Sequence, residues 1–341
     1  MQKNISNVCI VDSVYTLFLY SLIIDDDQLE KTYYFVSSGI AESIIKNLKQ
    51  VTYVPNVKGF KSGKLYRFVT LRLLSGIRFP FLKKAKIWGH DHIPLSWFLI
   101  GNRRYTCIED GPIIWSTYVN CGKYESDKLF WEKSHSLKDF ILKAVLSPVY
   151  RAEIGSNSLC EEMIVTTDDY HDFREGKKIT KINPSALWKN ASDVKKNYIK
   201  HLYSLSQADI DAAKAKKTVL ITQPFSSDGV ITEVEQIAIY RKMLEGTNIA
   251  DVLIKPHPRD KIDYGKYFPS AMVFEKPLPF QLLSIIGIKF NRAITVCSST
   301  ITSFDYKLDI EISGTTVHPK LVETYGILNE KDLIKKLEFN L

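Results

Sequence analysis

Residues 218–255 read TVLITQPFSSDGVITEVEQIAIYRKMLEGTNIADVLIK, and this stretch decides the fold class. Thr218–Thr222 is a short apolar run typical of a buried strand, and Ala250–Ile254 is a second one. Between them, Thr232–Leu244 has a helical pattern and opens with a Thr-x-x-Glu capping box. A strand, a helix and another strand in this order predict a parallel sheet covered by helices.

The same alternation of short apolar runs and helical patterns extends in both directions. Further strands are predicted at Val8–Val11, Tyr33–Val36, Val51–Val54, Ile87–Gly89, Tyr105–Ile108, Met272–Phe274, Arg292–Cys297 and Leu308–Ile312. Further helices are predicted at Ser13–Ile24, Ala41–Leu48 and Leu95–Ile100, and from Pro279. Residues 123–200 look more irregular, with one long helix at Ser136–Leu146. We therefore expect an α/β protein of two Rossmann-like domains, residues 1–200 and 201–341, facing a central cleft.

Length and composition agree with this architecture. The chain has 341 residues, of which 45% are hydrophobic and 25% charged, as in globular proteins of about two domains. Its five cysteines are scattered and include no Cys-x-x-Cys pair, which argues against a disulfide framework or a structural zinc site. The longest apolar run, Val14–Ile24, is too short to cross a bilayer, and no signal peptide is evident. We expect a cytoplasmic protein.

Positive charge is concentrated in one segment. The chain has 46 basic and 38 acidic residues, a net charge of +8, and nine of the basic residues lie between Lys58 and Lys86 without one acid. Lys58, Lys61, Lys64 and Arg67 recur every three residues, which would place them on one face of a helix. A basic helix flanked by aromatic residues is what an anionic membrane surface attracts. A plain solvated surface and a nucleic-acid contact are the alternatives, and no nucleic-acid-binding motif accompanies the segment.

The clearest chemical motif follows a predicted strand. Val252-Leu-Ile-Lys255 runs directly into Pro256-His257-Pro258-Arg259. The two prolines fix the backbone, so the imidazole of His257 is presented on a rigid loop. Lys255 and Arg259 would attract a phosphate or carboxylate, and a histidine beside a departing phosphate can donate a proton to it. A surface turn is the alternative.

Two other strand exits carry carboxylates. Glu109, Asp110 and Gly111 follow the strand Tyr105–Ile108, and one of the paired carboxylates could act as a base. An ordinary Asp-Gly turn is the alternative. Asp228 lies on the loop that follows Thr218–Thr222, where by itself it signals only a turn.

Hydroxyl groups follow a third strand. Ser298, Ser299 and Thr300 stand where the predicted strand Arg292–Cys297 gives way to a helix, a geometry suited to an anion. Ordinary helix capping explains one of these hydroxyls more easily than three. The acidic runs at 25–27 and 168–172 look like solvated loops, so no metal site is predicted. Glycine-rich phosphate loops are absent as well.

In order along the chain, the acidic-acidic-Gly motif at 109–111, the His-Pro motif at 257–258 and the Ser pair at 298–299 resemble those of bacterial sialyltransferases. The relevant groups are glycosyltransferase family 52 and the related polysialyltransferase and multifunctional sialyltransferase families. The resemblance implies a GT-B fold, CMP-sialic acid as the donor substrate, an inverting displacement, and no need for a metal or another cofactor.

The resemblance also implies roles for single residues. His257 matches the general acid or phosphate contact, and Ser298 and Ser299 match the pair that holds the CMP phosphate and the sialic carboxylate. Asp110 matches the base of some of these families, whereas family 52 favours the loop that carries Asp228. Gln281 stands where relatives often have a glutamate that binds the nucleotide ribose. Other substrate contacts are expected from Glu109, Gly111, Lys255, Pro258, Arg259 and Thr300.

These observations favour an inverting sialyltransferase that builds a bacterial lipooligosaccharide, O-antigen or capsule at the inner face of the cell membrane. Its partners would be the nucleotide-sugar donor, a glycan or glycolipid acceptor and an anionic membrane, without nucleic acid, and a homodimer is an open alternative to a monomer. One alternative function is a GT-B transferase with a UDP-sugar or activated polyol donor. Another is a catalytically silent subunit that binds a nucleotide sugar or a membrane.

Overall fold

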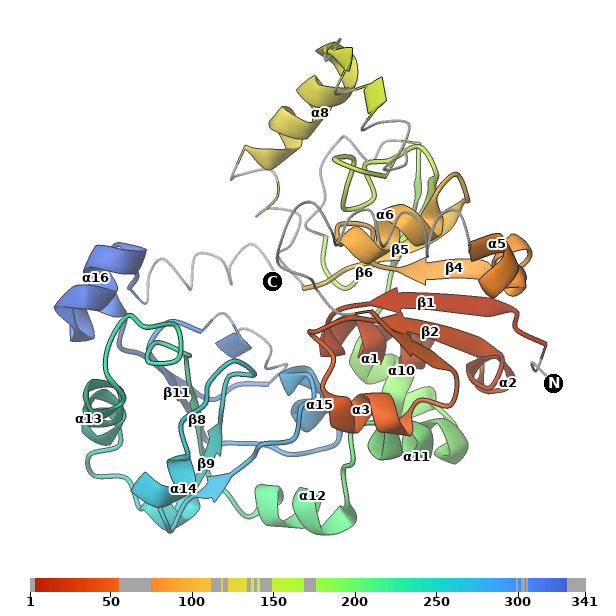
Figure 1. Ribbon diagram of the computed structural model, residues 1–341. Coiled ribbons are helices and arrows are strands. Elements are labelled where there is room, and N and C mark those ends of the chain that lie inside the picture. Colours follow the sequence, from red (N-terminus) through yellow and green to blue (C-terminus); the bar gives the residue numbers. More distant parts are fainter. Residues whose placement is uncertain are drawn as a thin grey trace. The chain divides into compact units, whose positions relative to one another are not determined.

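The computed structural model describes residues 4–54, 75–111, 118, 122–133, 136–137, 140–141, 149–168, 176–298, 300–301, 304 and 306–329. The chain divides into two compact units, Met1–Tyr203 and Ser204–Leu341 (Figure 1). Each unit holds one parallel sheet with helices packed against it. The α/β fold with two Rossmann-like sheets that the sequence predicts is therefore confirmed.

The N-terminal unit is built on a seven-stranded parallel sheet of order β3-β2-β1-β4-β5-β6-β7. Its strands are β1 Asn7–Val11, β2 Thr32–Val36, β3 Val51–Tyr53, β4 Lys86–Gly89, β5 Tyr105–Ile108, β6 Cys160–Val165 and β7 Lys178–Lys181. The direction of the strand order reverses between β1 and β4. Ligands of open α/β sheets bind at such a switch point, beyond the carboxyl ends of the strands.

Helices cover both faces of this sheet, so that every residue of β1 is buried. On one face, Val8 and Ile10 share a core with Phe98 and Leu99 of α6. On the other face α1 contacts α10 and α11, and Figure 1 shows these three helices on the side opposite α6. The helices are α1 Val14–Ile23, α2 Asp26–Leu29, α3 Glu42–Asn47, α5 Ser75–Arg78, the 3-10 turn Pro80–Lys83, α6 Pro94–Ile100, α8 Lys123–Lys133, α10 Pro184–Asn190 and α11 Asp193–Leu202.

The C-terminal unit repeats the design on a five-stranded parallel sheet of order β10-β9-β8-β11-β12. Its strands are β8 Thr218–Ile221, β9 Val252–Lys255, β10 Met272–Val273, β11 Arg292–Thr295 and β12 Asp309–Ile312. Leu220 and Ile254 share a core with Tyr240 of α13 and Leu321 of α16. The helices are α12 Gln207–Lys214, α13 Glu233–Met243, α14 Tyr264–Tyr267, α15 Phe280–Ile285 and α16 Pro319–Tyr325, with 3-10 turns at Ile249–Asp251 and Thr315–Val317.

Two predicted helix starts are confirmed at the level of single hydrogen bonds. The Ser13 side chain accepts from the backbone N–H of Thr16 at 3.2 Å and caps α1. At α13, Thr232 accepts from the N–H of Glu235, whose carboxylate accepts in return from the N–H of Thr232 at 2.7 Å. Each cap satisfies donors that a helix start leaves open, a contribution of roughly 0.5–2 kcal/mol.

Residues 123–200, which look more irregular in sequence, contain several regular elements. This stretch contains α8, the strands β6 and β7 and the helices α10 and α11. Its charged residues hid the strand pattern because they pair across the strands near the edge of the sheet. Glu162 of β6 lies opposite Lys178 of β7, and their side chains form an ion pair at 2.6 Å.

Some predictions fall on residues that the structure does not describe. The basic residues Lys58, Lys61, Lys64 and Arg67 lie outside the described residues, as does most of the helix predicted at Ser136–Leu146. Within the described ranges, no helix is both long enough and apolar enough to cross a membrane.

Candidate functional site

His257 is held on the loop that follows β9, at the carboxyl edge of the C-terminal sheet. Its backbone N–H donates to Oγ1 of Thr222, the residue that follows the neighbouring strand β8, at 3.1 Å. Its ring Nδ1 accepts from the backbone N–H of Arg259 at 3.1 Å. Because Nδ1 is an acceptor, the neutral ring carries its proton on Nε2. His257 can therefore donate a hydrogen bond to an anion without first becoming charged.

Asp228, on the loop after β8, forms an ion pair with Arg259, on the loop after β9. The guanidinium of Arg259 donates to Oδ1 of Asp228 at 2.7 Å. The structure thus brings together Asp228, His257 and Arg259, which the sequence placed on two separate strand exits. The pair is partly exposed and therefore adds little to stability. The ion pair instead fixes the position of the two loops, because it joins the loop after β8 to the loop after β9 beside His257.

The surroundings of His257 favour its neutral form. Burial lowers the pKa of His257, and the charge of Arg259 lowers it further, against the opposing effect of Asp228 and Asp260. Burial is the largest of these causes. A bound anion would have the opposite effect, because it favours the charged imidazolium.

Lys255, the last residue of β9, is buried at the same edge. Its Nζ donates to the backbone carbonyl of Lys276 at 3.0 Å. Burial lowers the pKa of Lys255 to about 8, with a small opposing effect from Glu275. A buried ammonium group has lost most of its hydration, so an anion close to it would be strongly attracted.

A partly buried polar network holds both loops, and sequence reasoning did not identify it. Oδ2 of Asp260 accepts from Thr222 at 3.0 Å, from Gln236 at 3.2 Å and from Tyr264 at 2.6 Å. The fully buried Gln236 also accepts from the N–H of Ser226 at 2.7 Å. The signal in the sequence was weak: Asp260 directly follows the His257 motif, and Gln236 is a polar residue on the buried face of α13.

The predicted hydroxyl residues follow β11, which lies next to β8. Ser298 is buried, its N–H donates to Oγ1 of Thr295 at 3.2 Å, and its Oγ accepts from the N–H of Thr300 at 3.3 Å. Ser298 therefore has a capping role in this turn, and no described residue accepts a hydrogen bond from its hydroxyl. Ser299 lies outside the described residues.

The remaining predicted residues of this unit lie at its surface or in its first helical turns. Pro258 is exposed in the turn that contains His257. Gln281 is half-buried in the first turn of α15. A second His-Pro pair begins at His318, which caps α16 by accepting from the N–H of Lys320 at 3.2 Å.

In the N-terminal unit, Glu109 is a buried structural carboxylate. One oxygen accepts from the hydroxyl of Tyr15 at 2.8 Å, and the other accepts from the N–H of Thr166 at 2.9 Å. The side chain is only 1% exposed. Because the protein itself satisfies both oxygens, Glu109 positions β5 between α1 and the end of β6. At Gly111 no atom of the described residues would contact a Cβ, so close packing among them does not require glycine there.

Asp110 lies between two histidines that sequence reasoning missed. Its Oδ1 is 3.3 Å from Nε2 of His90, and its Oδ2 is 3.3 Å from Nε2 of His92. Burial opposes ionisation of Asp110, yet the two imidazoles hold its pKa well below the usual range. The sequence signal was His-x-His directly after the strand Ile87–Gly89. Gly89 is required there, because with φ of +118° a Cβ would collide with the carbonyl oxygen of Ile10.

His90, His92 and Asp110 also have the spacing of a metal site, since one ligand atom from each lies within 4.8 Å of the others. The hydrogen bonds of His90 oppose this use. Its Nδ1 accepts from the N–H of Asp12 at 3.2 Å, so its Nε2 carries a proton, which reaches Oγ1 of Thr16 at 2.7 Å. A metal-binding histidine instead donates through its second nitrogen. The cluster is therefore better suited to moving protons than to holding a cation.

Comparisons with known proteins agree with these motifs. The model of glycosyltransferase family 52 matches residues 100–321. An uncharacterized protein of Haemophilus influenzae is 26% identical over 328 residues, which cover 94% of this chain and 97% of that protein.

Two solved structures share the fold. One is a Photobacterium 2,6-sialyltransferase in complex with CMP and lactose, with a TM-score of 0.58 and 11% identity over 98% of this chain and 76% of that chain. The other is a sialyltransferase from Photobacterium damsela, with a TM-score of 0.51 and 13% identity over 96% and 80% of the two chains. The family match spans the acidic motif, the His-Pro motif and the Ser pair, and the two sheets are those of GT-B enzymes. The chain therefore belongs to glycosyltransferase family 52.

Proposed function

We propose that this glycosyltransferase transfers sialic acid from CMP-sialic acid to a sugar hydroxyl of a bacterial surface glycan. The C-terminal unit would bind the donor, and the N-terminal unit would bind the acceptor. The observation that carries the proposal is the orientation of His257: its Nδ1 accepts from the N–H of Arg259, so its Nε2–H is available to the donor phosphate. The sialyltransferase of the same fold that was solved with CMP and lactose supports the choice of both substrates.

The chemistry requires charge to be stabilised where it develops. As the bond between the sialyl carbon and the phosphate oxygen breaks, negative charge grows on the phosphate of CMP. His257 would donate a proton or a hydrogen bond there, and Lys255 would contribute a buried positive charge close by. Ser298 and Ser299 would hold the donor's other anionic groups. Asp228 and Asp110 are the two carboxylates that could take the proton of the acceptor hydroxyl, either directly or through a neighbour.

The choice of donor can be tested by binding. Titration calorimetry with CMP and with UDP should show binding of CMP at micromolar to millimolar concentrations and much weaker binding of UDP. The His257→Ala variant should bind CMP more weakly. A chain that binds UDP and ignores CMP would favour the alternative of a UDP-sugar transferase, for which Gln281 in place of glutamate is the specific observation.

The hydroxyl pair provides a separate prediction. Replacing Ser298 and Ser299 together by Ala removes two donors, each worth about 1.5–3 kcal/mol to a charged partner. The KM for CMP-sialic acid should therefore rise at least tenfold in initial-rate measurements. Ser270→Ala, an exposed serine of the same unit, is the matched control. A double variant with unchanged donor KM and an unchanged melting temperature would reject the anion-binding role.

We also propose that the basic segment docks the enzyme on an anionic membrane. Its motivation is the sequence, with nine cations and no acid between residues 58 and 86. Replacing Lys58, Lys61, Lys64 and Arg67 by Gln should weaken sedimentation with anionic liposomes, most clearly at low salt, where charges are least screened. Neutral liposomes are the control. Equal binding of variant and wild type to anionic liposomes would show that the segment is only a solvated surface.

A further inference from the structure

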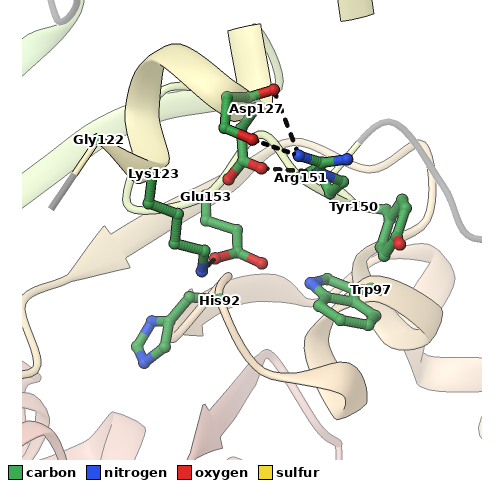
Figure 2. Close-up of a pocket in the computed structure, with 9 residues that line it drawn as sticks. His92, Trp97, Gly122, Lys123, Asp127, Tyr150, Arg151 and Glu153 are labelled. Atoms are coloured by element: carbon green, nitrogen blue, oxygen red, sulfur yellow. Dashed lines mark hydrogen bonds and ion pairs between the residues drawn. The ribbon is translucent and has the colours of Figure 1, made fainter. Parts of the chain in front are cut away.

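The N-terminal unit contains a cavity of about 610 Å³ that the proposed donor chemistry does not use. Its wall is formed by the loop after β4, by α6, by the start of α8 and by the segment before β6. Figure 2 shows the side chains around it. Its lining includes His92, Trp97, Lys123, Asp127, Tyr150 and Glu153.

The charges in this N-terminal cavity neutralise one another. Lys123 forms an ion pair with Glu153, and Nε of Arg151 lies 2.7 Å from Oδ1 of Asp127. Asp127 and Glu153 are each only 3% exposed. Two cations and two carboxylates leave no net charge to attract a phosphate or a nucleotide. The cavity therefore favours a neutral ligand that can bond to both donors and acceptors.

The aromatic residues of the cavity indicate what that neutral ligand is. Trp97 and Tyr150 pack edge to face with their ring centroids 4.9 Å apart. The indole Nε1 of Trp97 is buried, and within the described residues it has no hydrogen-bond partner. A buried N–H without a partner is uncommon in folded proteins. Aromatic rings beside carboxylates match the apolar faces and hydroxyl groups of a sugar ring.

His92 also lines this cavity, and its ring contacts Asp110. Its Nε2 faces Oδ2 of Asp110 at 3.3 Å, so the neutral ring keeps its proton on Nε2. No described residue forms a hydrogen bond with Nδ1 of His92, so within this part of the chain that nitrogen can accept a proton. A carboxylate that fixes the tautomer of a histidine is the arrangement by which proteins turn imidazole into an oriented base.

We propose that the N-terminal cavity binds the neutral saccharide of the acceptor and that His92, oriented by Asp110, takes the proton of its reacting hydroxyl. The inference rests on the proposed sialyl transfer. The acceptor O–H proton moves to Nδ1 of His92 as the acceptor oxygen forms its bond to the sialyl carbon. The bond from that carbon to the phosphate oxygen breaks, and its electron pair leaves with CMP. His92 then returns its proton to water, with Asp110 ionised throughout.

The groups that face His92 determine its pKa, and thereby how the rate of transfer should change with pH. Burial lowers the pKa of His92, but the hydrogen bond and charge of Asp110 and the charges of Asp91 and Glu153 outweigh it, so the pKa is raised. His90 lies against its ring, and Lys123 partly neutralises Glu153. A base must be neutral to act, so transfer should rise with pH through this raised pKa. Asp110→Asn removes the group that raises the pKa of His92 most. The pH at which the transfer rate rises should therefore become lower in this variant.

The first experiment tests the cavity alone. In protein labelled with ¹⁵N-tryptophan, the indole signal of Trp97 is identified by Trp97→Phe and followed while neutral mono- and disaccharides, including lactose, are added. We expect at least one saccharide to shift the Trp97 signal and to leave that of Trp188 on α10 unchanged. CMP should not shift it. If no saccharide shifts Trp97, or if CMP does, the assignment of the cavity is wrong.

The second experiment tests His92, with the saccharide that gives the largest shift as acceptor. His92→Gln should lower kcat for transfer at least 100-fold with little change in the donor KM, the scale expected for a lost base. Asp110→Asn should move the rising part of the pH profile to lower pH. His201→Gln, an exposed histidine on α11, is the control. Full transfer by His92→Gln, or an unmoved profile in a stably folded Asp110→Asn variant, would overturn the role of His92.

The two proposals fail in different ways. If wild-type protein releases no CMP from CMP-sialic acid, the proposed function fails, whereas the saccharide titration still reports on the cavity. If CMP is released but His92→Gln transfers normally, sialyl transfer stands and only the role of His92 falls.

Discussion

Replacing His257 by Ala is expected to lower kcat for sialyl transfer by about 10²–10⁴, the range typical of a lost acid catalyst. The reason lies in the local geometry. The N–H of Arg259 fixes Nδ1 as an acceptor, the N–H of His257 is tied to Thr222, and Nε2–H is left for the departing phosphate. Alanine removes this donor and leaves the loop anchored by the hydrogen bonds of Asp260. Initial rates with CMP-sialic acid and a saccharide acceptor measure the effect.

The chain offers a closely matched control for this variant. His318 also precedes a proline, and its Nδ1 also accepts the N–H two residues later, at 3.2 Å. It lies at the start of α16, where its Nε2 is 3.5 Å from Glu235. His318→Ala should therefore cost some stability, visible as a lower melting temperature, and leave kcat nearly unchanged. Equal losses of kcat in both variants would mean that His257 matters only for folding.

The second large effect is expected at the two candidate base carboxylates. Asp228→Asn and Asp110→Asn are to be compared in sugar transfer and in hydrolysis of the donor by water. The variant that disables the base should lose about 10²–10⁴ in transfer and keep donor binding, because only the acceptor hydroxyl needs its proton removed. If His92 is the proton acceptor, Asp110→Asn should be the variant that loses transfer and keeps donor binding. Asp228→Asn would then act mainly through Arg259, by raising the donor KM.

Reversed outcomes are equally informative. A transfer defect confined to Asp228→Asn would place the base on the loop after β8, as the family resemblance suggests. Normal transfer by both variants, each with an unchanged melting temperature, would show that neither carboxylate supports proton removal.

The sequence was sufficient to predict the sheet edges that carry the candidate site. Buried strands such as Val252–Lys255 read as short apolar runs, because both of their faces are covered by helices. In a parallel sheet their carboxyl ends share one edge, so the loops with Asp228 and His257 had to lie close together. The capping box at Thr232 shows that local hydrogen bonds could also be predicted from the sequence.

Other parts could not be predicted, since they depend on contacts between distant segments. The strand β6 carries charges that make sense only opposite β7, which lies more than ten residues further along the chain. The role of His90 and His92 depends on their contacts with Asp110, which follows a different strand. The cavity beside His92 needs Trp97 from α6 and Tyr150 from the segment before β6, two elements that no local pattern connects.

The most direct test of sialyl transfer is the release of CMP from CMP-sialic acid, measured with and without a panel of neutral saccharides, with UDP-N-acetylglucosamine as the comparison donor. We expect the wild-type chain to release CMP, to form a sialylated product visible by mass spectrometry, and to leave the UDP-sugar intact. His257→Ala should lose the release of CMP, and His318→Ala should retain it. Release of UDP from the comparison donor, with CMP-sialic acid untouched, would contradict the proposed function.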